Sequence, residues 1–453
     1  MKRSVFTVSY KIDDKSSVLF NTLNGALALV GENVTQDELC EGGFLAKDDA
    51  DEEKLLASRF LKDMNETSFL TLCIAPTMAC NLRCIYCYEE HEAIRMSSAV
   101  EDAIVRFVQQ RYNLFGFRDL EIIWYGGEPV LELARMESLS RRLMDWCSEQ
   151  DICYHASITT NATLVDEATA QRLTNMGIAS AMPTLDGCES HHNIRRPTAG
   201  KAGSYHETFD GIKALAAAGI NVGVNLNLGW DTIDDYRILS SKVNRLPGCA
   251  LYPSHLRNYG NWCVGCGEGC SCSPTCIPND TPSLMSREAY AKQLFEFYRE
   301  SNPSAGAIAE SLRSKRAFCH GKMASYFVID PEGYTYRCDG HMRDPRYRLF
   351  NILDSNAKLE WPEEIDLYQR NPRCKGCAVM PLCLGDCDWE WGMFKENCSA
   401  LKYTLEDYVR LLIEKTSLTL SEGENILQII EPVDVDARYV APFSPFAGDG
   451  VMG

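Results

Sequence analysis

The 453-residue chain lacks any long apolar segment. No run reaches the roughly 18 apolar residues of a membrane-spanning helix, and residues 1–17 lack the apolar stretch of a secretory signal. We therefore expect a protein of the reducing cytoplasm without a membrane partner. In that compartment, cysteines serve as metal ligands or catalysts more often than as disulfides.

Basic residues are scarce relative to acidic ones. Lys and Arg total 45 against 63 Asp and Glu, which gives a formal net charge of −18. Such a surface repels phosphate groups, so nucleic acid is disfavoured as a partner. A G-x-G-x-x-G turn is also missing after the first strand of the main domain, which weakens a dinucleotide-binding interpretation.

Cysteine, by contrast, is abundant, with 21 residues. A chain of this length can bury a large core without covalent staples, and an odd count argues against a framework made only of disulfides. Two groups have regular spacing, and thiolates spaced in this way hold iron–sulfur clusters or zinc. The first group is Cys80, Cys84 and Cys87, and the second is Cys319, Cys338, Cys374, Cys377, Cys383, Cys387 and Cys398.

Strand and helix patterns alternate from residue 69 to about residue 250. Residues 69–76 predict an apolar strand, residues 97–112 show helical periodicity, and the alternation continues through 220–228. Sustained alternation indicates parallel strands, either doubly wound or closed into a barrel. The predicted fold class is therefore α/β.

Four segments flank the main domain of residues 69–250. Residues 1–68 predict a small α+β element, either a cap or a docking element for a peptide leader. Residues 251–314 form a cysteine-rich insertion with a bridging helix, 315–405 hold the second cysteine group, and 406–453 predict a helix with a loosely ordered acidic tail. The insertion carries five cysteines, Cys263, Cys266, Cys270, Cys272 and Cys276.

The first cysteine triplet follows the first strand of the alternating series. In barrels, that end of the strands carries the chemistry. Three thiolates there can hold three irons of a [4Fe–4S] cluster and leave the fourth iron open to a substrate. A zinc site completed by a remote fourth ligand, or three unrelated buried thiols, would give the same spacing.

The motifs around this triplet resemble those of the radical S-adenosylmethionine (SAM) superfamily. Cys80-x3-Cys84-x-Tyr86-Cys87 is similar to its signature, and further matches follow in family order. The resemblance implies a partial (β/α)6 TIM-like barrel over residues 69–250. It also implies that the SAM amino group meets the turn Gly126, Gly127, Glu128 and Pro129, and that the ribose meets the strand from Ser157 through Thr160 to Asn161.

Two later stretches extend the resemblance. Leu185-Asp186-Gly187, followed by His192 to Arg196, is similar to a stretch of the peptide-modifying branch, in which Arg196 would meet the SAM carboxylate. Asn193 stands where that branch usually has Asp, so no ionic role is carried onto it. Val224 to Leu226 resembles the adenine-lining segment, which makes Leu226 a candidate contact.

The second cysteine group resembles the SPASM domain that follows many radical SAM barrels. By resemblance, Cys374, Cys377, Cys383 and Cys398 bind a distal auxiliary [4Fe–4S] cluster, and Cys319, Cys338 and Cys387 bind a proximal one. Either an insertion cysteine completes the proximal cluster, or one iron stays open to a substrate thiolate. From spacing alone, a four-cysteine knuckle would indicate zinc. Six other cysteines are expected to be small buried hydrophobes, namely Cys40, Cys73, Cys147, Cys153, Cys188 and Cys249.

The resemblance implies an enzyme with three [4Fe–4S] clusters that cleaves SAM to a 5′-deoxyadenosyl radical, which abstracts a hydrogen atom from its substrate. Enzymes of this layout mostly modify peptides. The expected substrate is a ribosomally made precursor peptide that acquires a thioether or another crosslink, with flavodoxin or ferredoxin as the one-electron donor. Anaerobic sulfatase maturation and peptide epimerisation are the alternatives among enzymes, and a non-catalytic metal-binding scaffold is the alternative outside them.

Overall fold

The structure, a computed structural model, describes residues 1–256, 284–313, 319–354, 367–370, 372–385, 398–417, 419–421 and 424–432. The chain divides into two compact units. Unit 1 comprises Met1–Asn65, Ser286–Cys319 and Pro362–Gly453, and unit 2 comprises Glu66–Met285 and His320–Trp361. Within the described ranges, no helix has both the length and the apolar character needed to cross a bilayer.

An eight-stranded sheet forms the centre of unit 2, in the order β11-β10-β9-β8-β7-β6-β12-β13. The six strands β6 to β11 pair in parallel, which confirms the partial barrel expected from the sequence. The last of them, β11, spans residues 249–255 and so extends past residue 250, where the alternating sequence pattern ends. These strands are β6 (Phe69–Ile74), β7 (Asp119–Trp124), β8 (Cys153–Thr160), β9 (Ile178–Pro183), β10 (Asn221–Leu228) and β11 (Cys249–His255).

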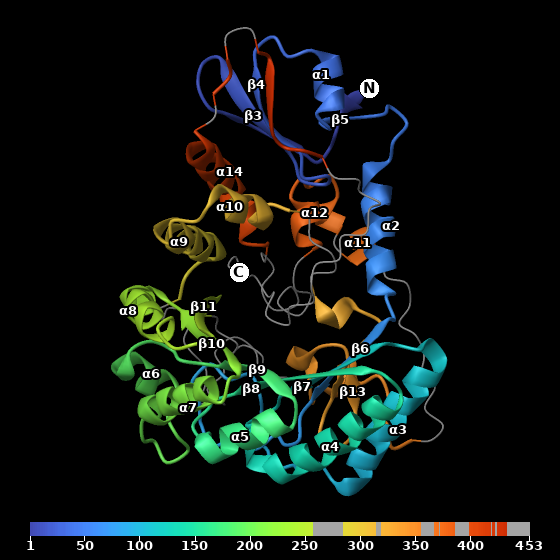
Figure 1. The fold of residues 1–453 in the computed structure, drawn as a ribbon, viewed down its shortest axis with the longest axis vertical. Coiled ribbons are helices and arrows are strands. Elements are labelled where there is room, and N and C mark those ends of the chain that lie inside the picture. The colour runs from blue at the N-terminus through green and yellow to red at the C-terminus, as the bar shows by residue number, and fades with distance from the viewer. Residues whose placement is uncertain are drawn as a thin grey trace. The chain divides into compact units, whose positions relative to one another are not determined.

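Helices cover one face of this sheet (Figure 1). Leu70, Leu72 and Ile74 are buried on the helical side, as strand alternation requires, and Thr71 and Cys73 lie on the opposite face. The helices are α3 (Ser98–Phe115), α4 (Leu133–Glu149), α5 (Glu167–Asn175), α6 (Glu189–Arg195), α7 (Tyr205–Ala217) and α8 (Ile233–Val243), with short 3-10 turns η1 (Pro129–Glu132) and η2 (Trp230–Thr232).

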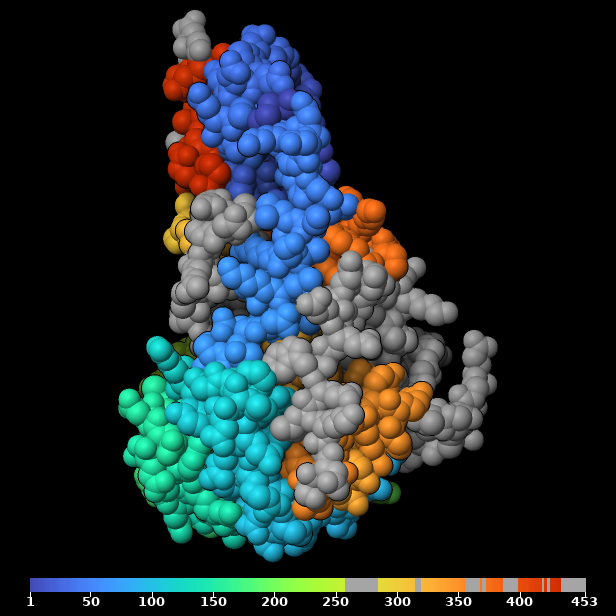
Figure 2. All heavy atoms as spheres, turned by 90° about the vertical axis from the view of Figure 1, so that its right-hand side faces the viewer, coloured from blue at the N-terminus to red at the C-terminus, as the bar shows by residue number. Residues whose placement is uncertain are grey.

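A late segment of the chain extends the same sheet. Strand β12 (Tyr326–Ile329) pairs in parallel with β6, and β13 (Thr335–Tyr336) pairs with β12 in the antiparallel sense. Short turns flank them, η4 (His320–Lys322), η5 (Asp339–His341) and η6 (Pro345–Tyr347). Figure 2 shows this segment (orange) and the first helical part of unit 2 (cyan) on the same face of that unit. The pairing joins segments about 250 residues apart, so no local sequence pattern predicts it.

Unit 1 begins with a four-stranded sheet in the order β14-β4-β3-β2. Its strands are β2 (Thr7–Lys11), β3 (Ser16–Asn21), β4 (Leu27–Gly31) and β14 (Ile426–Ile430), and a separate pair joins β1 (Lys2–Arg3) to β5 (Leu45–Ala46). Residues 433–453 lie outside the described residues, and residues 426–430 of the tail predicted to be loosely ordered form strand β14, which pairs with β4. It lies (red) beside the N-terminal strands (blue) in Figures 1 and 2.

Helices from three parts of the chain complete unit 1. Helices α1 (Gln36–Glu41) and α2 (Glu52–Met64) lie in the N-terminal segment that the sequence predicts as an α+β element. The others are α9 (Arg287–Glu300), α10 (Ala305–Ser311), α11 (Leu367–Arg370), α12 (Met380–Cys383) and α14 (Leu401–Thr416), with a 3-10 turn η7 (Pro372–Cys374). Leu56 and Phe60 of α2 share one apolar cluster with Leu367 and Met380. The turns that carry cysteines therefore pack on the N-terminal helix.

Candidate functional site

The first cysteine triplet lies in a loop, residues 75–97, that connects β6 to α3 and is called the cysteine loop below. Its two ends are held together by hydrogen bonds. The amide of Met78 donates to the Ile94 carbonyl at 3.1 Å, the amide of Met96 donates to the Pro76 carbonyl at 2.8 Å, and the Thr77 hydroxyl donates to the Ile94 carbonyl at 2.7 Å. The loop therefore starts and ends at the carboxyl edge of the sheet, where parallel strands place functional groups.

Cys80, Cys84 and Cys87 lie close enough for their charges to interact, and burial raises the pKa of all three thiols, that of Cys80 to about 11. Two N–H groups point to the sulfur of Cys80, from the Leu82 amide at 3.5 Å and from the Asn161 side chain at 3.7 Å. Metal binding would deprotonate such thiols, and N–H donors to sulfur support the resulting thiolate.

The middle of the cysteine loop pairs with the chain that follows α6. The amide of Arg83 donates to the Pro197 carbonyl at 2.7 Å, and the amide of Ile85 donates to the Arg195 carbonyl at 2.9 Å. Both bonds fall between the first and third cysteines. The backbone that spaces the thiols is therefore fixed by contacts distant in sequence.

The predicted GGEP turn packs directly on this loop. A Cβ atom on Gly126, whose φ is +109°, would lie 2.5 Å from the Thr77 carbonyl oxygen, and one on Gly127 would lie 2.4 Å from that of Ala79. The amide of Glu128 donates to the same Ala79 oxygen at 2.8 Å. Only glycine fits both positions, because any side chain would displace the loop.

Glu128 braces the turn from within. Its fully buried carboxylate accepts hydrogen bonds from the Thr160 hydroxyl and the Asn161 amide, each at 2.7 Å, and from the Val130 amide at 3.1 Å. These bonds join the end of β7 to the end of β8. The Glu128 carboxylate therefore has a structural role. Only the backbone of the turn remains as a candidate contact for a ligand. Pro129 begins η1.

Arg196 and Tyr86 belong to one buried network. The Arg196 guanidinium donates to the Tyr86 hydroxyl at 2.6 Å, and that hydroxyl donates to Asp186. Asp186 is fully buried and also accepts from the amide and the side chain of Asn227, at 2.9 and 3.0 Å. The Nε atom of Arg196 is buried without a hydrogen-bond partner among the described residues. An anionic ligand beside the cysteine loop would satisfy this donor.

Asn193, where the resembled family has Asp, caps a helix in this structure. Its side-chain oxygen accepts from the amides of Ser204 and Tyr205 at 2.9 and 3.0 Å, at the start of α7. The neutral amide supplies the acceptor that a helix N-terminus needs. Asn193 therefore has a structural role that requires no charge.

The predicted ribose and adenine contacts differ in position. Ser157 lies on the sheet face opposite the helices, with Cys73, and Asn161 lies just beyond the end of β8. Leu226 is fully buried on the same face of β10 as Val224. The neighbouring Asn227 lies on the opposite face of β10 and donates to Asp186, and the adenine contact of Leu226 stays a prediction.

The sequence analysis did not predict two carboxyl groups at the site, Glu89 in the cysteine loop and Asp339 after Cys338. Burial and the nearby Asp339 raise the pKa of Glu89 to about 8, and burial raises the pKa of Asp339 too. A carboxyl group that stays protonated near neutral pH can exchange a proton with a bound substrate. The available signal was positional, since Glu89 follows Cys87 by two residues and Asp339 directly follows Cys338.

Part of the second cysteine group comes together in unit 1. The Cys374 thiol lies within charge-interaction range of Cys377 and Cys398, and burial raises its pKa. The Lys402 ammonium donates to the sulfur of Cys398 at 3.3 Å. Cys383 is buried at the end of α12.

The remaining cysteines give a mixed result. Cys319 belongs to unit 1 and Cys338 to unit 2. Cys73 and Cys147 are buried as expected, but Cys40 and Cys153 are exposed, which corrects the prediction that both are core residues. The other predicted ligands, Cys387, Cys263, Cys266, Cys270, Cys272 and Cys276, lie outside the described residues.

The residues present fit a [4Fe–4S] cluster with SAM. In the part of the chain that the structure describes, no three His, Cys, Asp or Glu side chains are arranged around a single metal ion. A cluster does not need that arrangement, because each cysteine binds a different iron. The donor set is three neighbouring thiols, and the buried Arg196 Nε beside them suits a carboxylate.

Comparison with known proteins agrees with this site. The Radical SAM superfamily matches residues 74–237. A cysteine-type anaerobic sulfatase-maturating enzyme of Clostridium perfringens is 23% identical over 374 residues, which cover 75% of this chain and 94% of that protein. A GTP 3′,8-cyclase of Listeria monocytogenes is 31% identical over 310 residues, which cover 65% of this chain and 80% of the cyclase.

Solved structures show the same fold. The structure of anSMEcpe with bound AdoMet and a Cp18Cys peptide has a TM-score of 0.55 at 20% identity and covers 76% of this chain and 99% of that one. Streptococcus suis SuiB bound to its precursor peptide SuiA has a TM-score of 0.50 at 13% identity, with 87% and 97% covered. With the cysteine loop, the GGEP turn and the six parallel strands, the family match over residues 74–237 and the 31% identical relative show that the chain is an enzyme of the radical SAM superfamily.

Proposed function

We propose that the enzyme modifies a ribosomally made peptide, most simply by forming a thioether or another crosslink. The observation that carries this proposal is the buried Asp186–Tyr86–Arg196 network beside the cysteine loop, which leaves one guanidinium donor for an anion. Solved structures with this fold have AdoMet or peptides bound, which supports a peptide substrate.

The chain's own residues would bind and orient SAM. The glycine backbone of residues 126–127 is open to the amino group, and Arg196 would pair with the carboxylate while Tyr86 and Asp186 hold its guanidinium in place. When bound, the reduced cluster and SAM supply the 5′-deoxyadenosyl radical that abstracts hydrogen.

We also propose two auxiliary clusters. Cys374, Cys377, Cys383 and Cys398 would bind the distal one, and the proximity of three of these thiols supports this assignment. Cys319, Cys338 and Cys387 would bind the proximal one. An electron leaves the substrate in crosslink formation, so a nearby cluster would accept it, and flavodoxin or ferredoxin would supply the electron for SAM cleavage.

Sulfatase maturation is the second candidate. Serine-type and cysteine-type anaerobic sulfatase-maturating enzymes are 22–23% identical to this chain, which covers 77% and 94% of two of them. This likeness extends beyond the barrel, so it favours maturation over epimerisation as the alternative.

The test is anaerobic reconstitution with iron and sulfide, followed by SAM, dithionite and candidate peptides. About twelve irons with matching sulfide are expected, whereas zinc with little sulfide would indicate a scaffold. Peptides encoded next to the gene and peptides carrying a sulfatase active-site cysteine are compared by mass spectrometry. Loss of two hydrogens with sulfur retained indicates a crosslink, loss of sulfur indicates formylglycine, and deuterium gain from heavy water at otherwise unchanged mass indicates epimerisation. Absence of 5′-deoxyadenosine with every peptide would contradict the proposal.

A further inference from the structure

The end of β12 lies beside the start of the cysteine loop. The Ala75 amide donates to the Ile329 carbonyl at 3.0 Å, so the turn after β12 begins level with the first residue of the loop. Asp330 opens this turn. Its buried carboxylate accepts from the amides of Glu332 and Tyr334, at 2.9 and 3.0 Å, and from the Tyr336 hydroxyl at 2.9 Å. The turn is therefore rigid.

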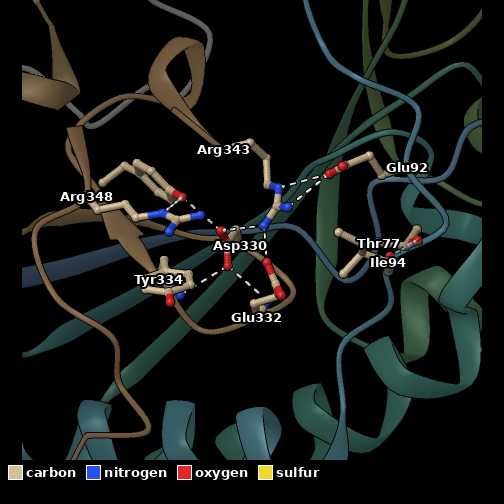
Figure 3. Close-up of polar contacts among 9 residues, drawn as sticks. Thr77, Glu92, Ile94, Asp330, Glu332, Tyr334, Arg343 and Arg348 are labelled. Carbon is tan, nitrogen blue, oxygen red and sulfur yellow. Dashed lines mark hydrogen bonds and ion pairs between the residues drawn. The ribbon is translucent and has the colours of Figure 1, made fainter. Parts of the chain in front are cut away.

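Arg343 connects this turn to the other end of the cysteine loop (Figure 3). Its guanidinium donates twice to one Glu92 oxygen, at 3.2 Å from Nε and 3.0 Å from the second terminal nitrogen, and the first terminal nitrogen pairs with Glu332 and lies 3.5 Å from Asp330. The Arg343 side chain is 18% exposed. One cation thus holds carboxylates of two separate segments.

Both partners of this ion pair lie shortly after a predicted cluster cysteine. Glu92 follows the last cluster cysteine by five residues and precedes Ile94, which closes the base of the loop through Thr77. Arg343 follows Cys338 by five residues and has a φ of +72°. Residues 90–94 form no helix or strand, so side-chain contacts add to the few backbone hydrogen bonds that hold the outgoing half of the loop.

We propose that Arg343 is a positioning residue for the SAM-binding cluster, acting through Glu92 to fix the outgoing half of the cysteine loop against the β12–β13 turn. The planar fork of arginine can bind carboxylates on two sides at once, which a lysine cannot. The role for SAM does not depend on the peptide. The position of Arg343 five residues after Cys338 matters only if the proposed auxiliary cluster forms, and that part rests on the proposed function.

The experiment compares Arg343→Gln, Glu92→Gln and the double variant in reconstituted holoenzyme. Amide hydrogen exchange over residues 88–96 should quicken roughly five- to tenfold in each single variant. The double variant should be no worse than Arg343→Gln, since Glu92→Gln removes only a contact that Arg343→Gln already breaks. The electron paramagnetic resonance spectrum of the reduced cluster should lose much of its change on SAM addition, with KM for SAM raised more than kcat is lowered.

Arg172→Gln is the matched control, because it breaks a bidentate pair with Glu137 on the helical side of the same unit, at 2.7 and 2.8 Å. It should leave exchange in the loop and the SAM-induced spectral change intact. Arg343→Lys should restore only part of both. If Arg343→Gln unfolds the unit, Glu92→Gln tests the contact from the loop side.

Unchanged loop exchange in Glu92→Gln, additive effects in the double variant, or exchange that rises equally throughout unit 2 would overturn the positioning role. The readouts need no peptide. A failure to modify any peptide, combined with the expected loop and spectral effects, would remove the proposed function and leave this role standing.

Discussion

The cysteine loop of unit 2 and the cysteine turns of unit 1 are supported in different ways. The loop is bonded to the β7 and β8 ends, to the chain after α6 and to its own base, so sheet geometry sets the spacing of its thiols. Cys374 and Cys383 lie in helical turns of three or four residues, Cys377 lies between them, and all three pack by apolar contact on α2. The first site is built by the scaffold, whereas the second depends more on whatever its thiols bind.

The largest effect should follow from Cys84→Ala. Removing one of three iron ligands should lower 5′-deoxyadenosine formation by more than about a thousandfold, because SAM can then no longer be held at a competent cluster. Reconstituted protein with dithionite and SAM, assayed by chromatography, gives the rate. Cys147→Ala, a buried cysteine on α4, should keep activity, and equal losses in both variants would argue against a special role for the triplet.

Cys377→Ala should show that the cysteine loop and the cysteine turns have different functions. We expect SAM cleavage to persist at a reduced rate while modified peptide disappears, because only the proposed distal cluster is damaged. The ratio of peptide product to 5′-deoxyadenosine measures this uncoupling, with Cys40→Ala, an exposed cysteine of unit 1, as the control. Loss of both products in equal proportion would mean that the two regions fail as one.

A smaller effect should come from the network under Arg196. Asp186→Asn removes the charge that holds Tyr86 and Arg196, and we expect KM for SAM to rise about 10- to 100-fold, equivalent to roughly 1.4–2.8 kcal/mol. Asp166→Asn, at the start of α5, serves as the control. An unchanged KM would show that Arg196 does not need this anchor.

The smallest effect concerns the sheet beneath the loop. Burial raises the pKa of Glu121 from its ordinary 4.5 to about 7, against the opposing hydrogen bond from Thr71. The folded state then binds this proton more tightly than the unfolded chain, so the contribution of Glu121 to stability is full below about pH 4.5 and is lost as the pH rises through about 7.

Glu121→Gln should therefore gain stability relative to the natural protein as the pH rises from about 5 to 8, by roughly 1–3 kcal/mol in the free energy of unfolding. Urea denaturation at several pH values gives this difference. Glu167→Gln, exposed on α5, should show a flat difference. A flat difference for Glu121→Gln as well would mean that its carboxyl is solvated in the folded state.

The sequence predicted local secondary structure and motifs well, but it did not predict strand pairing between distant segments. The alternating patterns predicted β6 to β10 and most barrel helices, and the motif order located the cysteine loop and the GGEP turn. Strands β12 and β14 were missed because their partners lie hundreds of residues away. For the adenine-lining segment, a motif match alone does not say which residue points toward a ligand, because successive residues of a strand face opposite sides of the sheet.

The sequence did not predict the buried polar networks either. Nothing in the pattern around Tyr86 says that its hydroxyl joins Arg196 to Asp186, since these bonds form only after three strand ends meet. The same holds for Asn193, whose acceptor role at α7 replaces the acid of the resembled family. Such contacts depend on tertiary geometry that composition and periodicity do not encode.

Strand β14 has a consequence for biosynthesis. Because residues 426–430 complete the sheet that residues 7–31 begin, the edge of β4 that β14 covers stays unpaired during synthesis until residue 430 has emerged from the ribosome. An open edge of this kind invites pairing with other chains. Nascent protein interrupted before residue 426 should therefore associate or be degraded, and metal loading of such fragments would yield no lasting enzyme.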